Sequence, residues 1–268
     1  MAFSLVESLG RAAIPAVVLS VFALARRYFP AKPAKEFAGT LSIKDLDARF
    51  ALTQWGVGIA MVVIGVAIAW ATHAVLVNLN RLVATLEGPS EFVLLPQTAI
   101  WWFLPGFAAV TLAWEITLGV WSSVGDKEEV ELYNYWTITK AGFDSTRILR
   151  IMAVVIVLPI AILTALAIPQ HGALKSDEIR ARGYGLGGVQ LYRYSDARRM
   201  TIIKGFRDRN GKMTRRAGVV LDFSDGRRWS SAHLGNFEPI VDPNLVGFLQ
   251  AKVGLQPEYA DTESDIPR

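Results

Sequence analysis

Three long stretches of the chain contain no Asp, Glu, Lys or Arg, and this feature constrains the fold more than any other. Crossing the hydrocarbon core of a bilayer takes about 20 consecutive, mostly apolar residues. A helix on the surface of a soluble protein needs a polar face, so it seldom carries so long an uncharged run. The sequence therefore predicts an integral membrane protein. The charge-free stretches cover residues 52–79, 92–114 and 151–170, and the corresponding spans are expected near 53–78, 93–121 and 150–169.

A fourth apolar segment lies near the N-terminus and is harder to interpret. Its core, 12–25, has only 14 residues and ends at Arg26. That is short for a span and long enough for a signal peptide. A retained span near 8–25, a cleaved signal and an interfacial helix all remain open, with the span favoured. The expected fold is thus an α-helical membrane bundle of three to four transmembrane helices over 1–170, followed by a soluble domain.

Basic residues in the short loops predict the orientation of these helices. The loops 26–50 and 122–150 together contain ten Lys and Arg residues, whereas the N-terminal stub and loop 80–91 contain two. Short cytoplasmic loops are enriched in Lys and Arg. We therefore expect a multi-pass protein of the cytoplasmic (inner) membrane, with both basic loops in the cytoplasm and the C-terminal domain outside.

Two polar residues inside the predicted spans are candidates for intramembrane chemistry. Glu115 could relay a proton or bind a cation, because ionisable residues within spans are commonly functional. It also lies close enough to the end of its span to reach the head groups. His73 is predicted near the end of its helix that leads into loop 80–91, whereas Glu115 is predicted near the other membrane surface. The two residues should therefore lie about 20 Å apart along the membrane normal. A direct pair between the two side chains is therefore not expected.

The soluble domain, 171–254, is predicted as a small α+β fold with an antiparallel meander sheet and one closing helix. Strand-like runs cover 178–182, 189–194, 199–206, 216–223 and 227–231, and Asn210-Gly211 between two of them is typical of a hairpin turn. Asp242 and Pro243 suit the first positions of a helix, and Gly254 suits its end. The polar, acidic segment 255–268 is expected to be disordered.

One resemblance emerges from the sequence LYRYSDARR at 191–199, an Asp-Gly turn before Arg227-Arg228-Trp229, and the closing amphipathic helix. This pattern, over about 176–254, resembles the pleckstrin-homology-like domains that bacterial membrane proteins append to their helices. The resemblance implies a non-enzymatic platform for contacts with lipids or proteins.

Charge in the domain agrees with a platform. Between Arg193 and Arg228 there are eleven basic and four acidic residues. A basic surface next to a membrane attracts anionic lipid, although outward-pointing charges also simply keep a sheet soluble. The candidate lipid- or partner-binding residues, which include the one directly after Phe206, are Arg193, Arg198, Arg199, Lys204, Arg207, Arg215, Arg216, Arg227 and Arg228.

Other chemistry finds little support in the sequence. The chain has no cysteine, which excludes disulfides and thiolate sites, and its histidines His73, His171 and His233 are too scattered to suggest a metal. The G-x-G-x-x-G run at 183–188 precedes a strand-like segment rather than a helix, so it predicts a hairpin loop and not a nucleotide site. The residues Asp225, Ser230, Ser231 and His233 lack the nucleophile elbow of a hydrolase.

The sequence thus predicts a non-enzymatic membrane protein whose small basic domain binds lipid head groups or a protein partner. No cofactor, metal or nucleic acid is expected, and a homo-oligomer is possible. The alternative is a small transporter or ion-coupled subunit that uses Glu115. Four helices without an evident inverted repeat make that alternative the weaker one.

Overall fold

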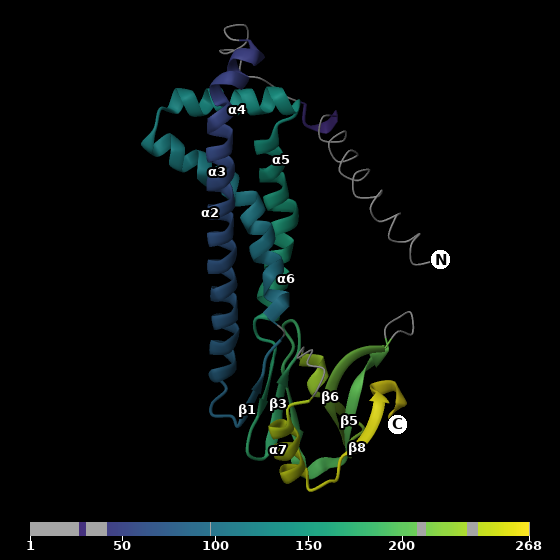
Figure 1. Ribbon diagram of the computed structural model, residues 1–268. Coiled ribbons are helices and arrows are strands. Elements are labelled where there is room, and N and C mark those ends of the chain that lie inside the picture. The colour runs from purple at the N-terminus through teal and green to yellow at the C-terminus, as the bar shows by residue number, and fades with distance from the viewer. Residues whose placement is uncertain (1–26, 31–41, 97, 208–212, 235–240, 268) are drawn as a thin grey trace, which may run out of the picture. The chain divides into compact units, whose positions relative to one another are not determined.

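The chain folds into two compact units in the computed structural model, which describes residues 27–30, 42–96, 98–207, 213–234 and 241–267 (Figure 1). The first unit comprises Met1–Trp70 and Pro105–Pro159, and the second comprises Ala71–Leu104 and Ile160–Arg268. The N-terminal segment predicted to span near 8–25 lies outside the described residues. Both units draw on distant parts of the sequence, so the boundary predicted at residue 170 does not separate them.

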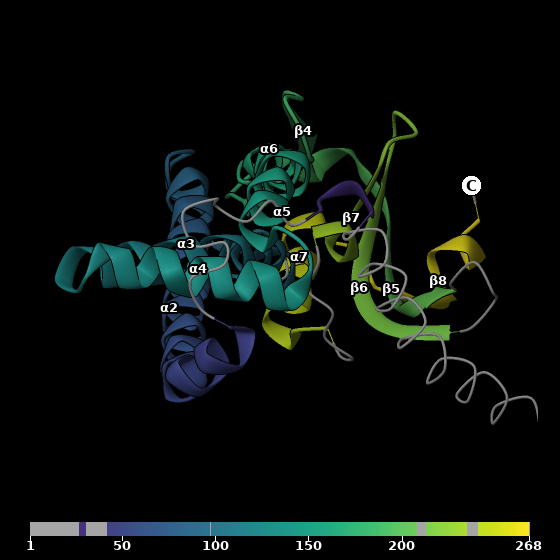
Figure 2. The ribbon, with the colours of Figure 1, turned by 90° about the horizontal axis from the view of Figure 1, so that it is seen from above.

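The first unit is helical. Its elements are the front part of α2 (Ile43–Thr85), most of α3 (Phe103–Val124), α4 (Lys127–Ala141), α5 (Ser145–Met152), the π-helical turn η3 (Ala153–Val157) and the start of α6 (Leu158–Ala167). Short polar caps define α4 and α5, because Asp126 and Asp144 each accept a hydrogen bond from a backbone N–H of the first turn. α4 runs across α2 in both ribbon views (Figures 1 and 2).

The contacts between these helices explain why α2 begins before its predicted span. Leu46 and Phe50 are fully buried against Tyr133 and Trp136 of α4. Further along α2, a Cβ on Gly65 would lie only 3.7 Å from that of Ala113, so small residues allow close approach to α3. The polar start of α2 is therefore helical because α4 covers it.

Three helices among the described residues are long and apolar enough to cross a membrane: Ile43–Thr85, Ile100–Val124 and Ser145–Ala167. The prediction of three membrane helices is confirmed in this sense. The second span begins later than expected, because Phe92–Leu94 forms strand β1 and Thr98–Trp102 the 3-10 turn η2. Pro105 lies in the first turn of α3, a position where the missing N–H of proline is tolerated.

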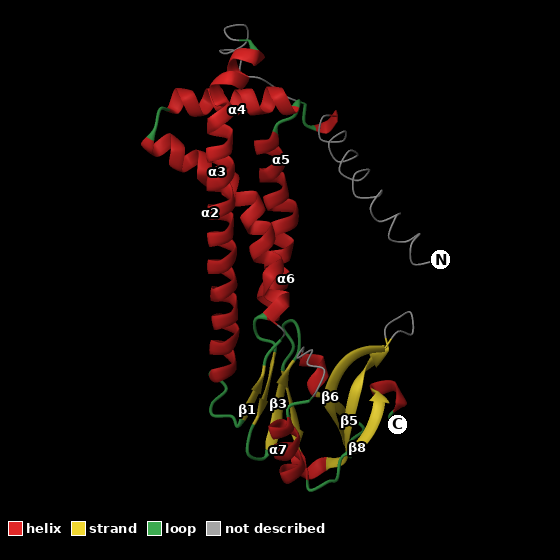
Figure 3. Ribbon diagram, in the orientation of Figure 1, coloured by secondary structure: helices red, strands yellow, loops and turns green. Residues whose placement is uncertain are grey.

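The second unit contains two four-stranded sheets among the described residues, drawn as yellow arrows in Figure 3. The first is fully antiparallel, in the order β1 (Phe92–Leu94), β2 (His171–Leu174), β3 (Glu178–Arg182), β4 (Val189–Arg193). The second has the order β7 (Arg228–Ser230), β6 (Met213–Phe223), β5 (Ala197–Arg207), β8 (Glu258–Thr262). The β5–β8 pair is parallel and the other pairs of this sheet are antiparallel.

One hydrophobic core joins the two sheets to α7 (Pro243–Val253). It combines residues of the first sheet, such as Leu174 and Ile179, with Leu221 of the second sheet and Leu249 of α7, all of them 0% exposed. The ends of α7 agree with the prediction: Asp242 caps its first turn, and Gly254 adopts φ 69° after its last. A separate sheet region with a packed helix therefore follows the membrane helices, as expected.

Two features of this unit differ from the prediction. Instead of a meander of about five strands, the described residues form eight strands in two sheets, with β1 supplied by the connection between two membrane helices. The segment expected to be disordered forms β8 and the 3-10 turn Glu263–Asp265, and Ile266 is only 5% exposed. Its acidic composition matches the basic strand beside it, since Asp261 lies 2.9 Å from Lys204. The composition of this segment alone does not reveal that it pairs with the basic strand β5.

Candidate functional site

Four arginines surround one open groove on the second sheet. They come from the start of β5 and from the β6–β7 turn, which are distant in sequence. The groove has a volume of about 740 Å³ and is lined by Arg198, Arg199, Asp222, Phe223, Gly226, Arg227, Arg228 and Pro267. Asp222 is the single acidic residue in this lining.

Strand register explains why these side chains converge. Arg199 of β5 pairs with Asp222 of β6, which in turn pairs with Arg228 of β7, so the three residues lie side by side across the sheet. The β5–β6 register shifts between Ala197 and Arg199, and a bulge of this kind re-aims neighbouring side chains. The adjacent turn needs φ 81° at Gly226, a conformation that glycine adopts without strain.

Ion pairs hold most of the arginines in place. Arg228 donates from Nε and Nη2 to the two oxygens of Asp222, at 2.6 and 3.3 Å. Arg199 donates from Nη1 to the carbonyl oxygen of Pro267 at 2.9 Å and lies 3.9 Å from Asp222. Arg198 is exposed and has no ion-pair partner among the described residues. The groove therefore combines oriented guanidinium groups with a positive charge that no carboxylate neutralises.

Arg227 completes the basic rim. Its backbone N–H and its Nε both donate to the carboxylate of Asp225, at 2.9 and 2.6 Å. These bonds lower the pKa of Asp225 below its usual value, the backbone bond contributing most. The guanidinium also lies 4.9 Å from the centre of the Tyr192 ring. Both contacts limit the freedom of a side chain that would otherwise extend into water.

A second, smaller cavity adjoins the groove through Arg228, which lines both. Its volume is about 220 Å³, and no Asp or Glu is among its lining residues, which are Gln170, Ala181, Arg182, Gly183, Gln190, Tyr192, Arg228, Trp229, Ser230 and Leu234. Three polar atoms of this lining, Arg182 Nε, Trp229 Nε1 and Ser230 Oγ, are buried without a hydrogen-bond partner in the described residues. All three can donate, so the cavity suits water or an oxyanion.

The remaining basic residues predicted to bind lie elsewhere. Arg193 is exposed on β4 and does not line the groove, and Lys204 pairs with Asp261 of β8. Arg207, Arg215 and Arg216 belong to the opposite end of the β5–β6 pair, where Gly205 pairs with Arg215. Arg207 follows Arg198 by nine positions along β5, which corresponds to about 30 Å of extended strand. The structure thus brings together Arg198, Arg199, Arg227 and Arg228, and separates them from the rest.

The intramembrane candidates have partners that the sequence did not indicate. Glu115 accepts hydrogen bonds from Nε and Nη2 of Arg150, at 2.9 and 3.2 Å. This counter-ion removes the feature that motivated a transporter, an uncompensated carboxylate within a span. The His73 ring stacks on Trp102 with centroids 4.1 Å apart, and its Nε2 is buried without a hydrogen bond within the described part of the chain.

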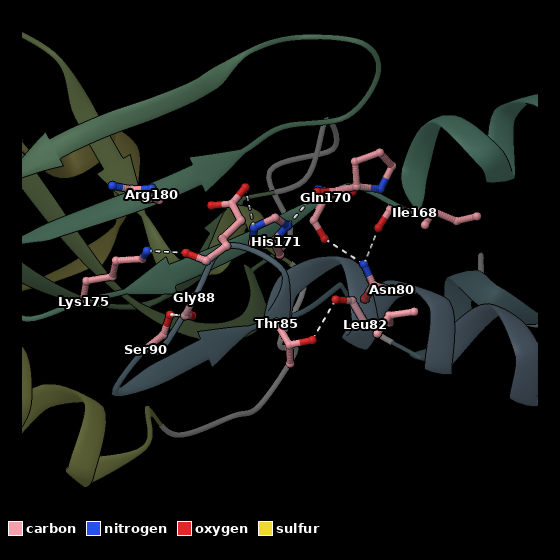
Figure 4. A network of polar contacts seen from close by, with 12 residues as sticks. Asn80, Leu82, Thr85, Gly88, Ser90, Ile168, Gln170, His171, Lys175 and Arg180 are labelled. Carbon is pink, nitrogen blue, oxygen red and sulfur yellow. Dashed lines mark hydrogen bonds and ion pairs between the residues drawn. The ribbon is translucent and has the colours of Figure 1, made fainter.

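A polar network that the sequence did not predict lies at the junction of α2, α6 and β2 (Figure 4). Asn80 donates from Nδ2 to the carbonyl oxygens of Ile168 and Gln170, at 2.6 and 3.0 Å. The buried His171 ring lies with Nε2 3.2 Å from Glu87, close enough for an ion pair but poorly aligned for a hydrogen bond. Lys175 donates to the backbone carbonyl of Glu87. These contacts tie the end of a membrane helix to the first sheet.

Comparisons with protein-family models, with curated proteins and with solved structures give no match. The function is therefore argued from the geometry of the arginine groove and its adjoining cavity.

Proposed function

We propose that the chain is a non-enzymatic integral membrane protein whose sheet domain binds the anionic head group of a membrane lipid in the arginine groove. The observation that carries the proposal is the convergence of Arg198, Arg199, Arg227 and Arg228 on one groove of about 740 Å³. A guanidinium presents paired donors that match the oxygens of a phosphate. Because Asp222 already orients Arg199 and Arg228, little conformational entropy remains to be lost on binding.

The arrangement of the domain supports the resemblance to pleckstrin-homology-like domains in outline. Two sheets face each other across one core, and α7 packs into that core with Leu245 and Leu249. Two strands of this fold come from outside the expected domain of residues 171–254. Strand β1 comes from the connection between membrane helices, and β8 comes from the acidic tail. The proposed platform is therefore built into the membrane part rather than appended to it.

The pairing of β1 with β2 bears on sidedness. If all three long helices span, this pairing requires the connection around 86–97 and the C-terminal domain to share one side of the membrane. The ten basic residues in loops 26–50 and 122–150, against two in the N-terminal stub and loop 80–91, favour that side as the outer face of a cytoplasmic membrane.

Cysteine labelling tests this sidedness directly, because the chain has no cysteine of its own. Lys127→Cys and Arg193→Cys replace exposed residues of the two regions. In spheroplasts, a membrane-impermeant maleimide is expected to label position 193 and to label position 127 only after lysis. The reverse pattern would contradict the proposed orientation.

Binding is tested by native mass spectrometry of the full chain in detergent, with added phosphatidylglycerol or phosphatidylcholine. The double variant Arg198→Gln/Arg227→Gln removes two groove cations, and Arg193→Gln removes an exposed cation outside the groove. At about 1 kcal/mol per well-placed arginine, the double variant should lose roughly 30-fold in affinity for phosphatidylglycerol. Phosphatidylcholine binding should not change, and Arg193→Gln should behave as wild type.

An additional experiment distinguishes a lipid ligand from a protein partner. Fluorescence anisotropy with a labelled hexaglutamate peptide measures whether the same groove prefers carboxylates. The wild-type protein could bind the peptide tightly, while the double variant loses the peptide but still retains phosphatidylglycerol. That result would replace the lipid proposal with an acidic protein partner. Equal lipid retention by the double variant and Arg193→Gln, without peptide binding, would refute a binding role for the groove.

A further inference from the structure

The tip of the β3–β4 hairpin has an unusual composition for a loop of a polar domain. Residues 183–188 comprise four glycines around Tyr184 and Leu186, with no charged residue among them. Tyr184 is 50% exposed and Leu186 is 88% exposed. A solvated hairpin turn normally carries polar residues such as Asn, Asp or Ser, so this tip calls for another explanation.

Two hydrogen bonds attach the tip to the membrane helix α6. The hydroxyl of Tyr184 donates to the carbonyl oxygen of Leu163 at 2.9 Å, and the N–H of Gly185 donates to that of Leu166 at 3.0 Å. Gly185 has φ 95°, which a residue with a side chain rarely adopts. The glycines thus allow the backbone to turn directly against the helix.

The length of the apolar stretch fixes the depth of this contact. The charge-free part of this helix runs from Ile151 to Ala167, about 26 Å, which is slightly shorter than the hydrocarbon core of about 30 Å. None of this helical stretch can therefore be spared from the membrane. Leu163 lies four residues before the end of α6 at Ala167, about 6 Å inside the helix end. Tyr184 therefore contacts a part of α6 that must lie in the bilayer if the helix spans.

The surface around the tip is apolar as well. Ile162 and Leu163 of α6 are each 54% exposed. An apolar cavity of about 230 Å³ lies beside them, and its lining includes Trp101, Phe103 and Tyr184. Exposed apolar surface that continues from a helix onto a loop favours contact with another apolar phase. A tyrosine with its ring in apolar surroundings and its hydroxyl bonded is typical of the membrane interface.

We propose that the 183–188 tip inserts into the bilayer beside α6, with Leu186 among the acyl chains and Tyr184 at their boundary with the head groups. The occupant of this surface, and of the adjoining cavity, is lipid. The insertion gives the sheet domain a further attachment to the membrane, in addition to its chain connections to α2, η2 and α6. It does not depend on what the arginine groove binds.

The test uses a single cysteine at position 186, labelled with the environment-sensitive fluorophore NBD, in the full chain reconstituted in nanodiscs. The matched control is Ser224→Cys, at the exposed β6–β7 turn of the second sheet. The label at 186 should emit at shorter wavelength than the label at 224. Phospholipid with a doxyl group at carbon 5 should quench it severalfold more than at 224, and aqueous iodide should quench it less.

Each other outcome contradicts the proposal. Iodide quenching at 186 equal to that at 224 would show a tip in water. A second copy of the chain covering the tip would give a different result. The label would then be protected from iodide only at high protein concentration, and doxyl lipid would not quench it. If the tip lies in water, Leu186→Gln should leave the nanodisc-bound protein unchanged, whereas insertion predicts faster amide exchange in β3 and β4 of this variant.

Discussion

Replacing Asn80 with alanine tests whether the end of α6 depends on a side chain of α2. The last carbonyl groups of a helix lack helical donors and need other partners. In α6, the carbonyls of Thr164, Leu166 and Ala167 accept from the backbone N–H groups of residues 168, 185 and 170. Beyond the helix, the carbonyls of Ile168 and Gln170 accept from Asn80. Alanine would remove both of these bonds at once.

The expected loss follows from the burial of the groups. Asn80 is 1% exposed, but Ile168 and Gln170 are half-buried, so water can partly replace the lost donor. Leaving a buried acceptor unpaired costs about 1–3 kcal/mol, and the lower end applies here. Two acceptors give a destabilisation of about 2 kcal/mol. The helix itself should gain slightly, because alanine has the better helix propensity.

Asn78→Ala is the matched control, because it makes the same change two residues earlier on the same helix. Asn78 is exposed, and its Nδ2 donates to the carbonyl of Ala74 in its own helix. This variant should unfold within about 0.5 kcal/mol of wild type. Thermal unfolding in nanodiscs, followed by tryptophan fluorescence, compares the two variants. Hydrogen exchange then localises the effect, which is expected as faster exchange at residues 168–174.

Equal stability of the two variants would refute the reasoning, and so would unchanged exchange at 168–174 in Asn80→Ala. The first result would mean that water replaces the side chain at no cost. The second would mean that any destabilisation arises elsewhere in the protein.

Two further predictions concern the packing of the second sheet. Ile266→Ala should destabilise the protein by about 2–5 kcal/mol, because Ile266 is buried among Ile203, Val220 and Ala232; a disordered tail would instead give no change in thermal unfolding. Gly218→Val should cost about 1–3 kcal/mol by overpacking, since a Cβ at Gly218 would lie 2.7 Å from that of Ala232. Its control, Gly247→Ala on α7, meets open space and should stabilise by about 0.5–1 kcal/mol; unfolding midpoints that do not separate these two glycine variants would contradict the packing argument.

Signals that act over a few residues were readable in the sequence. The helix ends at Asp242 and Gly254 were predicted, because a cap is made by a side chain and the backbone of the next turn. The β3–β4 hairpin around 183–188 was predicted from its glycines and flanking strands. The three long helices were predicted from charge-free length alone, since the thickness of the bilayer sets that length.

Pairings between distant segments were not readable. Strand β1 has three residues and β8 is acidic, so neither carries an alternating pattern. Each forms a strand because it pairs with the edge of a neighbouring strand, β1 with β2 and β8 with β5. The candidate site shows the same limit. Its residues were identified as a set of nine by charge, but charge along the chain could not separate the four arginines of the groove from the five basic residues elsewhere on β4, β5 and β6.

The sequence by itself determined that this protein has membrane helices, that a basic sheet region follows them, and where its best-capped helix begins and ends. These properties depend on composition and on contacts within a turn. Tertiary structure alone decided that Asn80 holds the end of α6, that Arg150 neutralises Glu115, and that Asp222 aligns Arg199 with Arg228. Each of these contacts joins residues on different elements. Their geometry is set by strand register and helix packing, which no short stretch of the sequence specifies.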